Sequence, residues 1–213
     1  MNIRSILFSI IATLLLVACS GGTKITDSWS NTALTPVKFK KMAVVGVTSR
    51  VEGRKAVELA MEEKLEASGI LAIGAFDFLP PNASKNNITQ EIFYRYLDLE
   101  KFDAVMIISV LAREKKVTST TSVSTYASWA PMYGMPLNDY YGTMAGYASV
   151  PVHQTTTPVY YLECALYSYP QGEMIWGATS KTTPLVNIEA TTQEYAMKVV
   201  QDLKKRKVLE GLK

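Results

Sequence analysis

The 213-residue sequence predicts an α/β fold in which a βαβαβ unit is followed by an antiparallel hairpin and a C-terminal helix, giving a mixed sheet with helices packed on it. The first half of the chain alternates short, continuously apolar runs with helical patterns, which is typical of strands covered on both faces. The second half contains an alternating strand, a turn and a second strand, which together predict a hairpin.

Three apolar runs are the predicted strands of the βαβαβ unit, at residues 42–47, 70–76 and 104–111. A helix is expected between the first two runs, because apolar residues recur there at i, i+3, i+4 and i+8 and Gly69 stands where a helix commonly ends. The apolar face of this helix consists of Val57, Ala60, Met61 and Leu65. The crossover between the two parallel strands is expected to be right-handed.

A second helix is expected between the second and third strands. Asn87, with Gln90 three residues later, has the spacing of a capping box at the start of a helix. The apolar face of this helix is predicted to be a stripe formed by Ile88, Ile92, Tyr96 and Leu99.

A hairpin and a helix complete the predicted domain. The alternating strand covers residues 158–168, the turn follows at 170–173, and the partner strand covers 174–179. The C-terminal helix is predicted over about residues 191–209. One face of the first hairpin strand carries Tyr160, Leu162, Cys164 and Leu166, and the inward face of the helix carries Ala196, Val199, Val200 and Leu203. Cys164 is therefore expected to be a small, buried, apolar residue.

The first 18 residues have the layout of a secretory signal: one positive charge at Arg4 precedes an apolar core that is too short to span a bilayer. Leu16-Val17-Ala18-Cys19 resembles the lipobox of bacterial lipoproteins. The resemblance implies that Cys19 becomes the first mature residue and carries acyl chains that hold the protein on a membrane. A cysteine lying near a signal cleavage site by coincidence is the alternative. Ser20, where an aspartate would retain such a lipoprotein in the inner membrane, implies the outer membrane, and the absence of an acidic run after Cys19 favours its periplasmic face.

Composition divides the rest of the chain into a tether and one domain. Residues 19–37 are predicted to be the lipidated N-terminus and a polar tether, with a short strand around Trp29 left open. Residues 38–213 are predicted to form a single α/β domain with a Tyr-rich insertion at about 117–157. The formal net charge of only +3 gives no indication of a nucleic-acid partner.

The chain contains no motif specific to an enzyme, a metal site or a cofactor, so no catalytic residue, metal or cofactor is expected. The single histidine, His153, lies in a loop-like stretch, and the spacing of Asp77, Asp98 and Asp103 does not require a metal or a paired acid and base. The loop after the first strand is more ambiguous. It could hold an anion at a helix N-terminus, or it could be a helix cap with solvated charges, and its polar residues are Thr48, Ser49, Arg50 and Arg54.

Four stretches, together with the lipobox, resemble one family of envelope lipoproteins: KKMAVVGVTSR, EASGI, FDAVMIISV and YYLECALYSYPQGEMIWGATSKT. That family is built on a TolB amino-terminal-like α/β domain and includes the curli-secretion lipoproteins and the lipoprotein activators of penicillin-binding proteins. Gly172, Ile175 and Trp176 match its G-x-x-I-W strand pair, whereas the Tyr-rich insertion departs from its pattern. The resemblance implies a non-enzymatic docking or assembly module.

The insertion contains the candidate partner-binding residues Tyr126, Trp129, Tyr133, Tyr140, Tyr141 and Tyr147. They form either a recognition surface for an envelope protein or glycan, or a segment that packs on the domain's own sheet. The sequence therefore predicts a lipid-anchored outer-membrane protein with a non-catalytic binding or assembly role. The alternatives are an enzyme-like domain that binds a small molecule or glycan at the loop after the first strand, and a purely structural lipoprotein.

Overall fold

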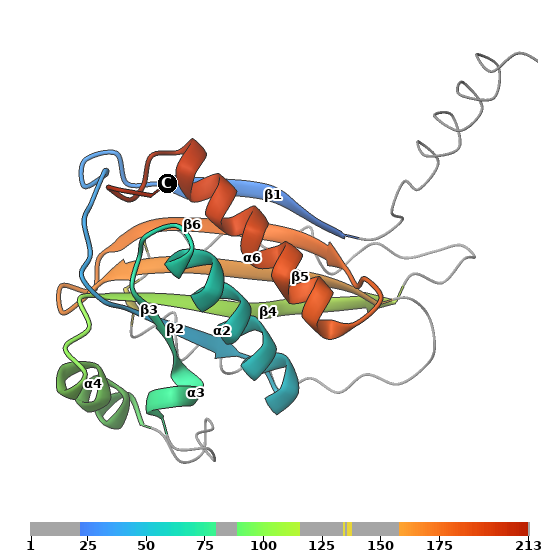
Figure 1. Cartoon of the computed structure of the whole chain (residues 1–213), viewed down its shortest axis with the longest axis horizontal. Helices are drawn as coiled ribbons and strands as arrows, with labels where there is room; N and C mark the ends of the chain where they lie inside the picture. Colours follow the sequence, from blue (N-terminus) through green and yellow to red (C-terminus); the bar gives the residue numbers. More distant parts are fainter. Residues whose placement is uncertain (1–21, 80–88, 116–133, 135, 138–157, 213) are drawn as a thin grey trace, which may run out of the picture.

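The computed structural model describes residues 22–79, 89–115, 134, 136–137 and 158–212, and it confirms the α/β fold class (Figure 1). A six-stranded mixed sheet has the strand order β1-β6-β5-β4-β2-β3. The strands are β1 (Gly22–Ser30), β2 (Met42–Val47), β3 (Ala72–Gly74), β4 (Ala104–Lys115), β5 (Pro158–Ser168) and β6 (Met174–Thr183). The helices are α2 (Val51–Glu66), α3 (Ala75–Phe78), α4 (Gln90–Leu99) and α6 (Ile188–Lys205).

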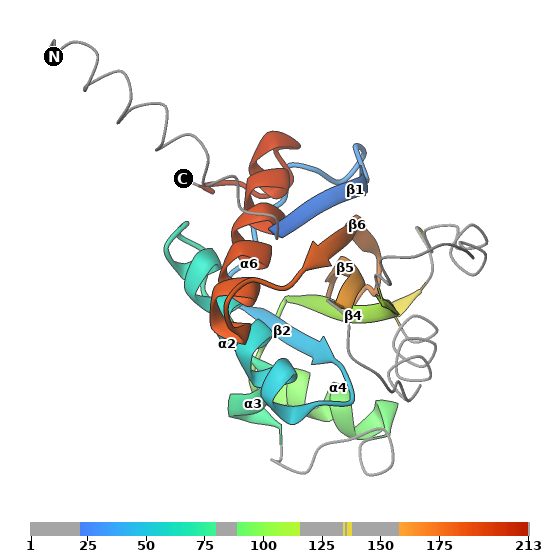
Figure 2. The ribbon, with the colours of Figure 1, turned by 90° about the vertical axis from the view of Figure 1, so that its right-hand side faces the viewer.

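One face of the sheet is covered by α2 and α6, which lie side by side in both views (Figures 1 and 2). The eight residues predicted to face inward from these two helices are all buried in the core cluster on this side. Asn187 begins α6 earlier than predicted, because its side chain accepts a hydrogen bond from the Ala190 backbone N–H. Periodicity therefore predicted the inward faces of both helices correctly, and only the bounds of α6 moved.

The other face carries a second core cluster, to which α3 and α4 contribute. Here the predicted apolar stripe of α4 is mostly wrong, although Tyr96 packs partly buried against this cluster. The buried residues of α4 are Phe93 and Leu97, whereas Ile92 is 39% exposed and Leu99 is 65% exposed. The helix begins at Gln90 and is capped by the Thr89 side chain, which accepts from the Ile92 backbone N–H; the predicted cap at 87 lies outside the described residues.

The predicted strand at residues 70–76 is shorter than expected. Only Ala72–Gly74 pairs, in parallel with β2, and the chain then turns directly into α3. The turn is fixed by Glu58, whose carboxylate accepts a hydrogen bond from the Phe76 backbone N–H at 2.7 Å. An apolar run at the edge of the sheet therefore supplies both a strand and the first turn of a helix.

Most of the described part of the segment predicted as a tether is a strand of the sheet, and residues 31–37 follow it as a turn and loop. The nine residues Gly22–Ser30 form β1, which pairs antiparallel with β6. The strand left open around Trp29 is therefore present, and it is longer than expected and lies at the edge of the sheet. The hydroxyls of Thr23 and Thr182 lie 2.9 Å apart across this pair. An edge strand with an exposed side has a polar composition, which resembles that of a linker.

The hairpin is confirmed: β5 has its predicted bounds, and β6 pairs antiparallel with it. β6 runs four residues further than predicted, because it pairs with β1 as well as with β5. Cys164 is buried with a free thiol, as expected, and Trp176 is fully buried. The described residues contain no helix long and apolar enough to cross a membrane.

Candidate ligand-binding cavity

A cavity of about 460 Å³ lies between the sheet and the helices α2 and α6. It forms where β2, β4 and β6 end and where the N-termini of α2 and α6 begin (Figure 1). In open α/β sheets, ligands bind at the carboxyl ends of the parallel strands, here β2 and β4. Its volume is within the range of about 300–1,000 Å³ that is usual for small-molecule sites.

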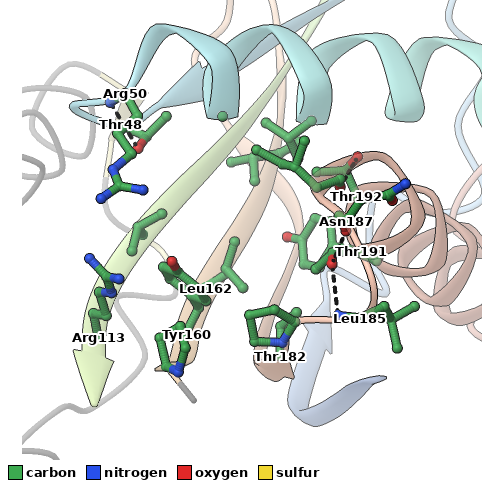
Figure 3. A pocket seen from close by; sticks show the side chains of 18 of the residues that line it. Thr48, Arg50, Arg113, Tyr160, Leu162, Thr182, Leu185, Asn187, Thr191 and Thr192 are labelled. Atoms are coloured by element: carbon green, nitrogen blue, oxygen red, sulfur yellow. Dashed lines mark hydrogen bonds between the residues drawn. The ribbon is translucent and has the colours of Figure 1, made fainter. Parts of the chain in front are cut away.

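The interior of the cavity is mainly apolar. The residues that form its apolar surface come from the sheet, from α2 and from the segment that enters α6, and they are Val47, Val57, Ile108, Val110, Leu162, Leu185 and Ile188. Thr182, Thr191 and Thr192 add hydroxyl groups (Figure 3). The Thr191 hydroxyl accepts from the Leu185 backbone N–H at 2.9 Å and donates to the Asn187 carbonyl at 2.7 Å, so it holds the wall of the cavity in place.

Two arginines, Arg50 and Arg113, are the charged residues of the lining, and no carboxylate is found among the described residues that line the cavity. In the view of Figure 3 they lie on the same side, with their guanidinium groups turned toward one another. The Arg113 guanidinium packs over the Tyr160 ring at 5.4 Å, and its Nε is buried without a hydrogen-bond partner among the described residues. Two guanidinium groups facing one space favour an anion there.

The helix N-termini add to this positive character. Arg50 occupies the N-cap position of α2 without a capping hydrogen bond from its side chain, so backbone N–H groups of the first turn lack that acceptor. The positive end of the α2 dipole is directed to the same end of the sheet as that of α6. Both features favour a negatively charged ligand group near Arg50.

Tyr195 is a buried polar residue of the lining. It is only 2% exposed, and its hydroxyl makes no hydrogen bond with the described residues by geometry. Burial raises the pKa of this hydroxyl well above its ordinary value, and the nearby Cys164 thiol raises it further. The hydroxyl is therefore neutral, and its polar neighbour inside this apolar region is the Cys164 thiol.

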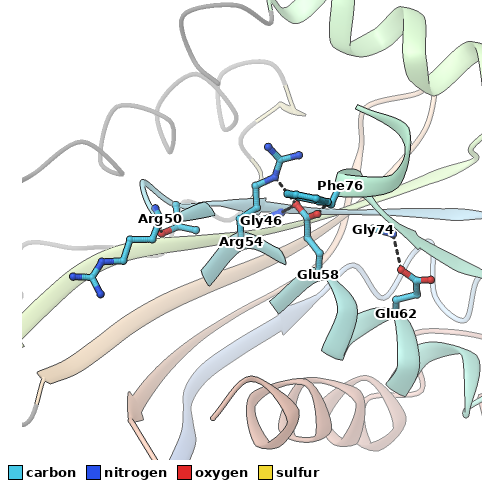
Figure 4. Close-up of polar contacts among 8 residues, drawn as sticks. Gly46, Arg50, Arg54, Glu58, Glu62, Gly74 and Phe76 are labelled. Atoms are coloured by element: carbon cyan, nitrogen blue, oxygen red, sulfur yellow. Dashed lines mark hydrogen bonds and ion pairs between the residues drawn. The ribbon is translucent and has the colours of Figure 1, made fainter. Parts of the chain in front are cut away.

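Only some of the polar residues in and after the loop that follows β2 line the cavity. Thr48 and Arg50 line the cavity, as anion binding at this loop would require, whereas Ser49 is not part of the lining. Arg54 is turned away and forms a 3.0 Å ion pair with Glu58 (Figure 4). The expectation of a solvated charge is wrong for Arg54, because its side chain is 12% exposed and lies 5.7 Å from the Phe76 ring.

Glu58 is the centre of this polar cluster. It accepts from the Gly46 backbone N–H at 2.8 Å and from Phe76, while Glu62, one turn later, accepts from the Gly74 backbone N–H at 3.0 Å (Figure 4). Burial raises the pKa of Glu58, although Arg54 and the backbone donors act in the opposite direction. Every oxygen of Glu58 has a partner, so its role is to hold α2 against β2 and α3.

The aspartates considered at the sequence level are not brought together. Asp98 accepts from the Tyr169 hydroxyl at 2.6 Å, and Asp103 accepts from the backbone N–H groups of Lys40 and Lys41 at 2.8 and 3.0 Å. No cluster of potential metal ligands occurs in the described part of the chain. Asp98 and Asp103 therefore have structural roles.

Sequence reasoning missed the residues that complete the cavity, namely Arg113, Asn187, Thr191 and Tyr195. Asn187 has a local signal, since Asn commonly caps a helix. Arg113 and Tyr195 come near α2 only through the pairing of β4 in the sheet and the packing of α6, which leave no local pattern.

The lipidation and partner-binding candidates lie outside the described residues: Cys19, Tyr126, Trp129, Tyr133, Tyr140, Tyr141 and Tyr147, together with His153. Within the Tyr-rich insertion the structure describes Gly134, Pro136 and Leu137. Leu137 is 2% exposed in the second core cluster, and the Gly134 backbone N–H lies 3.5 Å from the Met174 sulfur. This part of the insertion packs on the domain's own sheet.

No protein-family model and no curated protein sequence matches the chain. Two solved structures of the PelC dodecamer from Paraburkholderia phytofirmans are similar to it. One, a leucine-to-methionine variant, is 14% identical, covering 86% of this chain and 98% of that chain with a TM-score of 0.44. The other is 13% identical, covering 84% of this chain and 95% of that chain with a TM-score of 0.44.

Proposed function

We propose that this protein is a lipid-anchored component of the outer membrane whose periplasmic domain acts by binding an envelope molecule, without catalysis. The lipobox resemblance that ends at Cys19 supports the anchor. The resemblance to envelope lipoproteins with a TolB-like domain supports a docking or assembly role.

The observation that carries the proposal is the cavity between the sheet and the N-termini of α2 and α6. Its apolar surface can bury a ligand, and Arg50 and Arg113 provide charged donors to orient it. These groups bind and position a ligand. The proposed partner is an envelope protein or glycan, or a smaller envelope molecule presented to the cavity.

The anchor is tested with Cys19→Ser, which removes the site of acylation. The variant is expected to take up no labelled palmitate and to appear as an unprocessed or soluble species, because the acyl chains are the stable anchor that the sequence offers. Cys164→Ser is the matched control, since Cys164 is buried in β5 and should not affect labelling. A Cys19→Ser protein that fractionates as a fully processed membrane protein would refute the anchor.

The enzyme-like alternative remains a second candidate, since Thr48 and Arg50 of the loop after β2 line the cavity. An enzyme would convert a small molecule or glycan bound there. Incubation of the purified protein with envelope extracts, followed by mass spectrometry of the small molecules, separates the two functions. Conversion that is lost in Arg50→Gln supports the enzyme, and retention of an unchanged molecule supports binding.

A further inference from the structure

The geometry points to an anionic phospholipid as the occupant of the cavity, with an acyl chain in the apolar interior and the phosphate at Arg50 and Arg113. The phospholipid would come from the membrane that carries the anchor. This inference rests on the proposed function, and it names the ligand class of the same cavity. Three independent features of the described residues support it.

The first feature is the exposed apolar surface at the mouth of the cavity. Val51 directly follows Arg50 and is 57% exposed, and Val186 lies between the lining residues Leu185 and Asn187 and is 93% exposed. Ile188 lines the cavity and is also exposed. Exposed apolar side chains next to the lining at the N-termini of both helices favour a contact with an apolar partner or a membrane interface.

The second feature is the distance to the predicted anchor. β1 begins at Gly22, which pairs with Thr183, and the residues on both sides of Thr183 line the cavity. Figure 1 shows β1 beginning at the end of the sheet where β4 and β6 finish. Cys19 precedes Gly22 by three residues, a span of at most about 11 Å of extended chain. Acyl chains on Cys19 would thus place the membrane close to the opening.

The third feature is the charge of the lining. Arg50 and Arg113 face the cavity, whereas Glu52 and Glu189, the acids in the first turns of α2 and α6, are not part of the lining. A guanidinium matches the geometry of phosphate oxygens and can bind two of them at once. A neutral acyl group would fill the apolar interior but would provide no anion for the two arginines. An anionic phospholipid would fill the interior with its acyl chain and provide the anion with its phosphate.

The experiment reconstitutes the full-length protein into phosphatidylcholine vesicles that contain a trace of photoactivatable lipid. The probe is phosphatidylglycerol in one sample and phosphatidylcholine with the same acyl chains in the other, and labelled peptides are identified by mass spectrometry. Both lipids carry the phosphate, but phosphatidylcholine also brings a choline cation that the two arginines repel. Phosphatidylglycerol is therefore expected to label cavity peptides of β4 and α6 about tenfold more than phosphatidylcholine, the effect of one modest charge interaction. Equal labelling by both lipids, or label confined to the exposed rim, would overturn the inference.

Three variants test which residues contact the lipid. Arg50→Gln with Arg113→Gln should remove the preference for phosphatidylglycerol over phosphatidylcholine, whereas Arg95→Gln, exposed on α4 and outside the lining, should leave that preference unchanged. Leu162→Trp should fill the cavity and remove its label from both lipids. Thermal melting confirms that each variant is folded. Unchanged selectivity in a folded double-arginine variant contradicts the inference.

Two further outcomes separate this inference from the proposed anchor. If the lipidated protein takes no label in the cavity and the Cys19→Ser protein does, the occupant is the protein's own acyl chain, and the phospholipid inference fails. If the mass of the N-terminal peptide reveals no acylation while phosphatidylglycerol still labels the cavity selectively, the anchor fails and the phospholipid inference stands.

Discussion

Glu58 contributes to stability through an ion pair within α2 and through hydrogen bonds that join α2 to β2 and α3. Its carboxylate accepts from Arg54 and from the backbone N–H groups of Gly46 and Phe76, and the residue is almost completely buried. The space beside Gly46 is tight, since a Cβ there would lie 3.1 Å from the Val57 side chain, which would have to shift. The close approach of α2 to β2, which forms one wall of the cavity, therefore depends on this pair.

Glu58→Gln is expected to lower the free energy of unfolding by about 1–3 kcal/mol, because the amide nitrogen replaces one carboxylate oxygen and leaves one of the two backbone N–H groups facing a donor. Urea unfolding measures this loss. Glu52→Gln, exposed one and a half turns earlier on α2, is the control and should remain within about 0.5 kcal/mol of wild type. An equal effect of both substitutions would contradict the role of Glu58.

The wild-type and Glu58→Gln proteins also allow a test of the pH dependence of stability. Burial raises the folded-state pKa of Glu58 above its ordinary value of 4.5, so the folded state binds this proton more readily than the unfolded state does. Stability from this group is then fully present below pH 4.5 and is lost as the pH rises through the raised pKa. The stability difference between wild type and Glu58→Gln should widen as the pH falls toward 4.5.

At the scale of elements, Trp176 joins β6 to α6 and, through α6, to β1. Its indole Nε1 donates to Asp202 of α6 at 3.0 Å, and the Ser28 hydroxyl of β1 donates to the other oxygen of Asp202 at 3.1 Å. Arg206 pairs with Asp202 at 3.3 Å. The edge strand is thus fixed by the helix as well as by the backbone ladder of β6.

Trp176→Ala is expected to cost about 3–5 kcal/mol of unfolding free energy, because truncation of a fully buried aromatic leaves a large cavity. Trp176→Phe keeps most of the buried surface and removes only the hydrogen bond to Asp202, so it should cost clearly less. Chemical unfolding of both variants gives the comparison. A loss below about 1 kcal/mol for the alanine variant would refute the packing of Trp176.

Elements with a strong local pattern could be predicted from the sequence. The strand β2 and the alternating strand β5 have their predicted bounds, and the inward face of α2 follows its apolar spacing. The predictions failed where partners distant in the chain decide the outcome: β1 is a strand because β6 is beside it, and α3 starts where Glu58 accepts from Phe76.

The cavity could be predicted only in part for the same reason. Thr48 and Arg50 follow a strand directly and precede a helix, so their position at a helix N-terminus was recognisable. Arg113 and Tyr195 meet them through sheet order and helix packing. The lining of the cavity combines residues from β2, α2, β4, β5, β6 and α6, and no single stretch of the chain shows that combination.

At the scale of the whole molecule, the insertion between β4 and β5 contributes a residue to the second core cluster. β4 and β5 pair over their full length, so the insertion leaves and rejoins the sheet beside the cavity, near Arg113 and Tyr160. Leu137, from the middle of the insertion, is buried with Tyr167, Tyr169 and Met174 on the opposite face. The insertion is therefore not simply a detachable docking surface.

Leu137→Ala is expected to lower the free energy of unfolding by about 2–5 kcal/mol, the usual loss for truncating a buried leucine. Leu99→Ala is the control and should cost far less, because Leu99 is exposed on α4.

Replacement of residues 126–147 by a short Gly/Ser linker should lower the unfolding midpoint at least as much as Leu137→Ala, because it removes Leu137 together with its neighbours. The measurement is the midpoint of the unlipidated proteins. A replacement variant that melts at the wild-type temperature but no longer captures partners would restore the detachable-surface interpretation of the tyrosines.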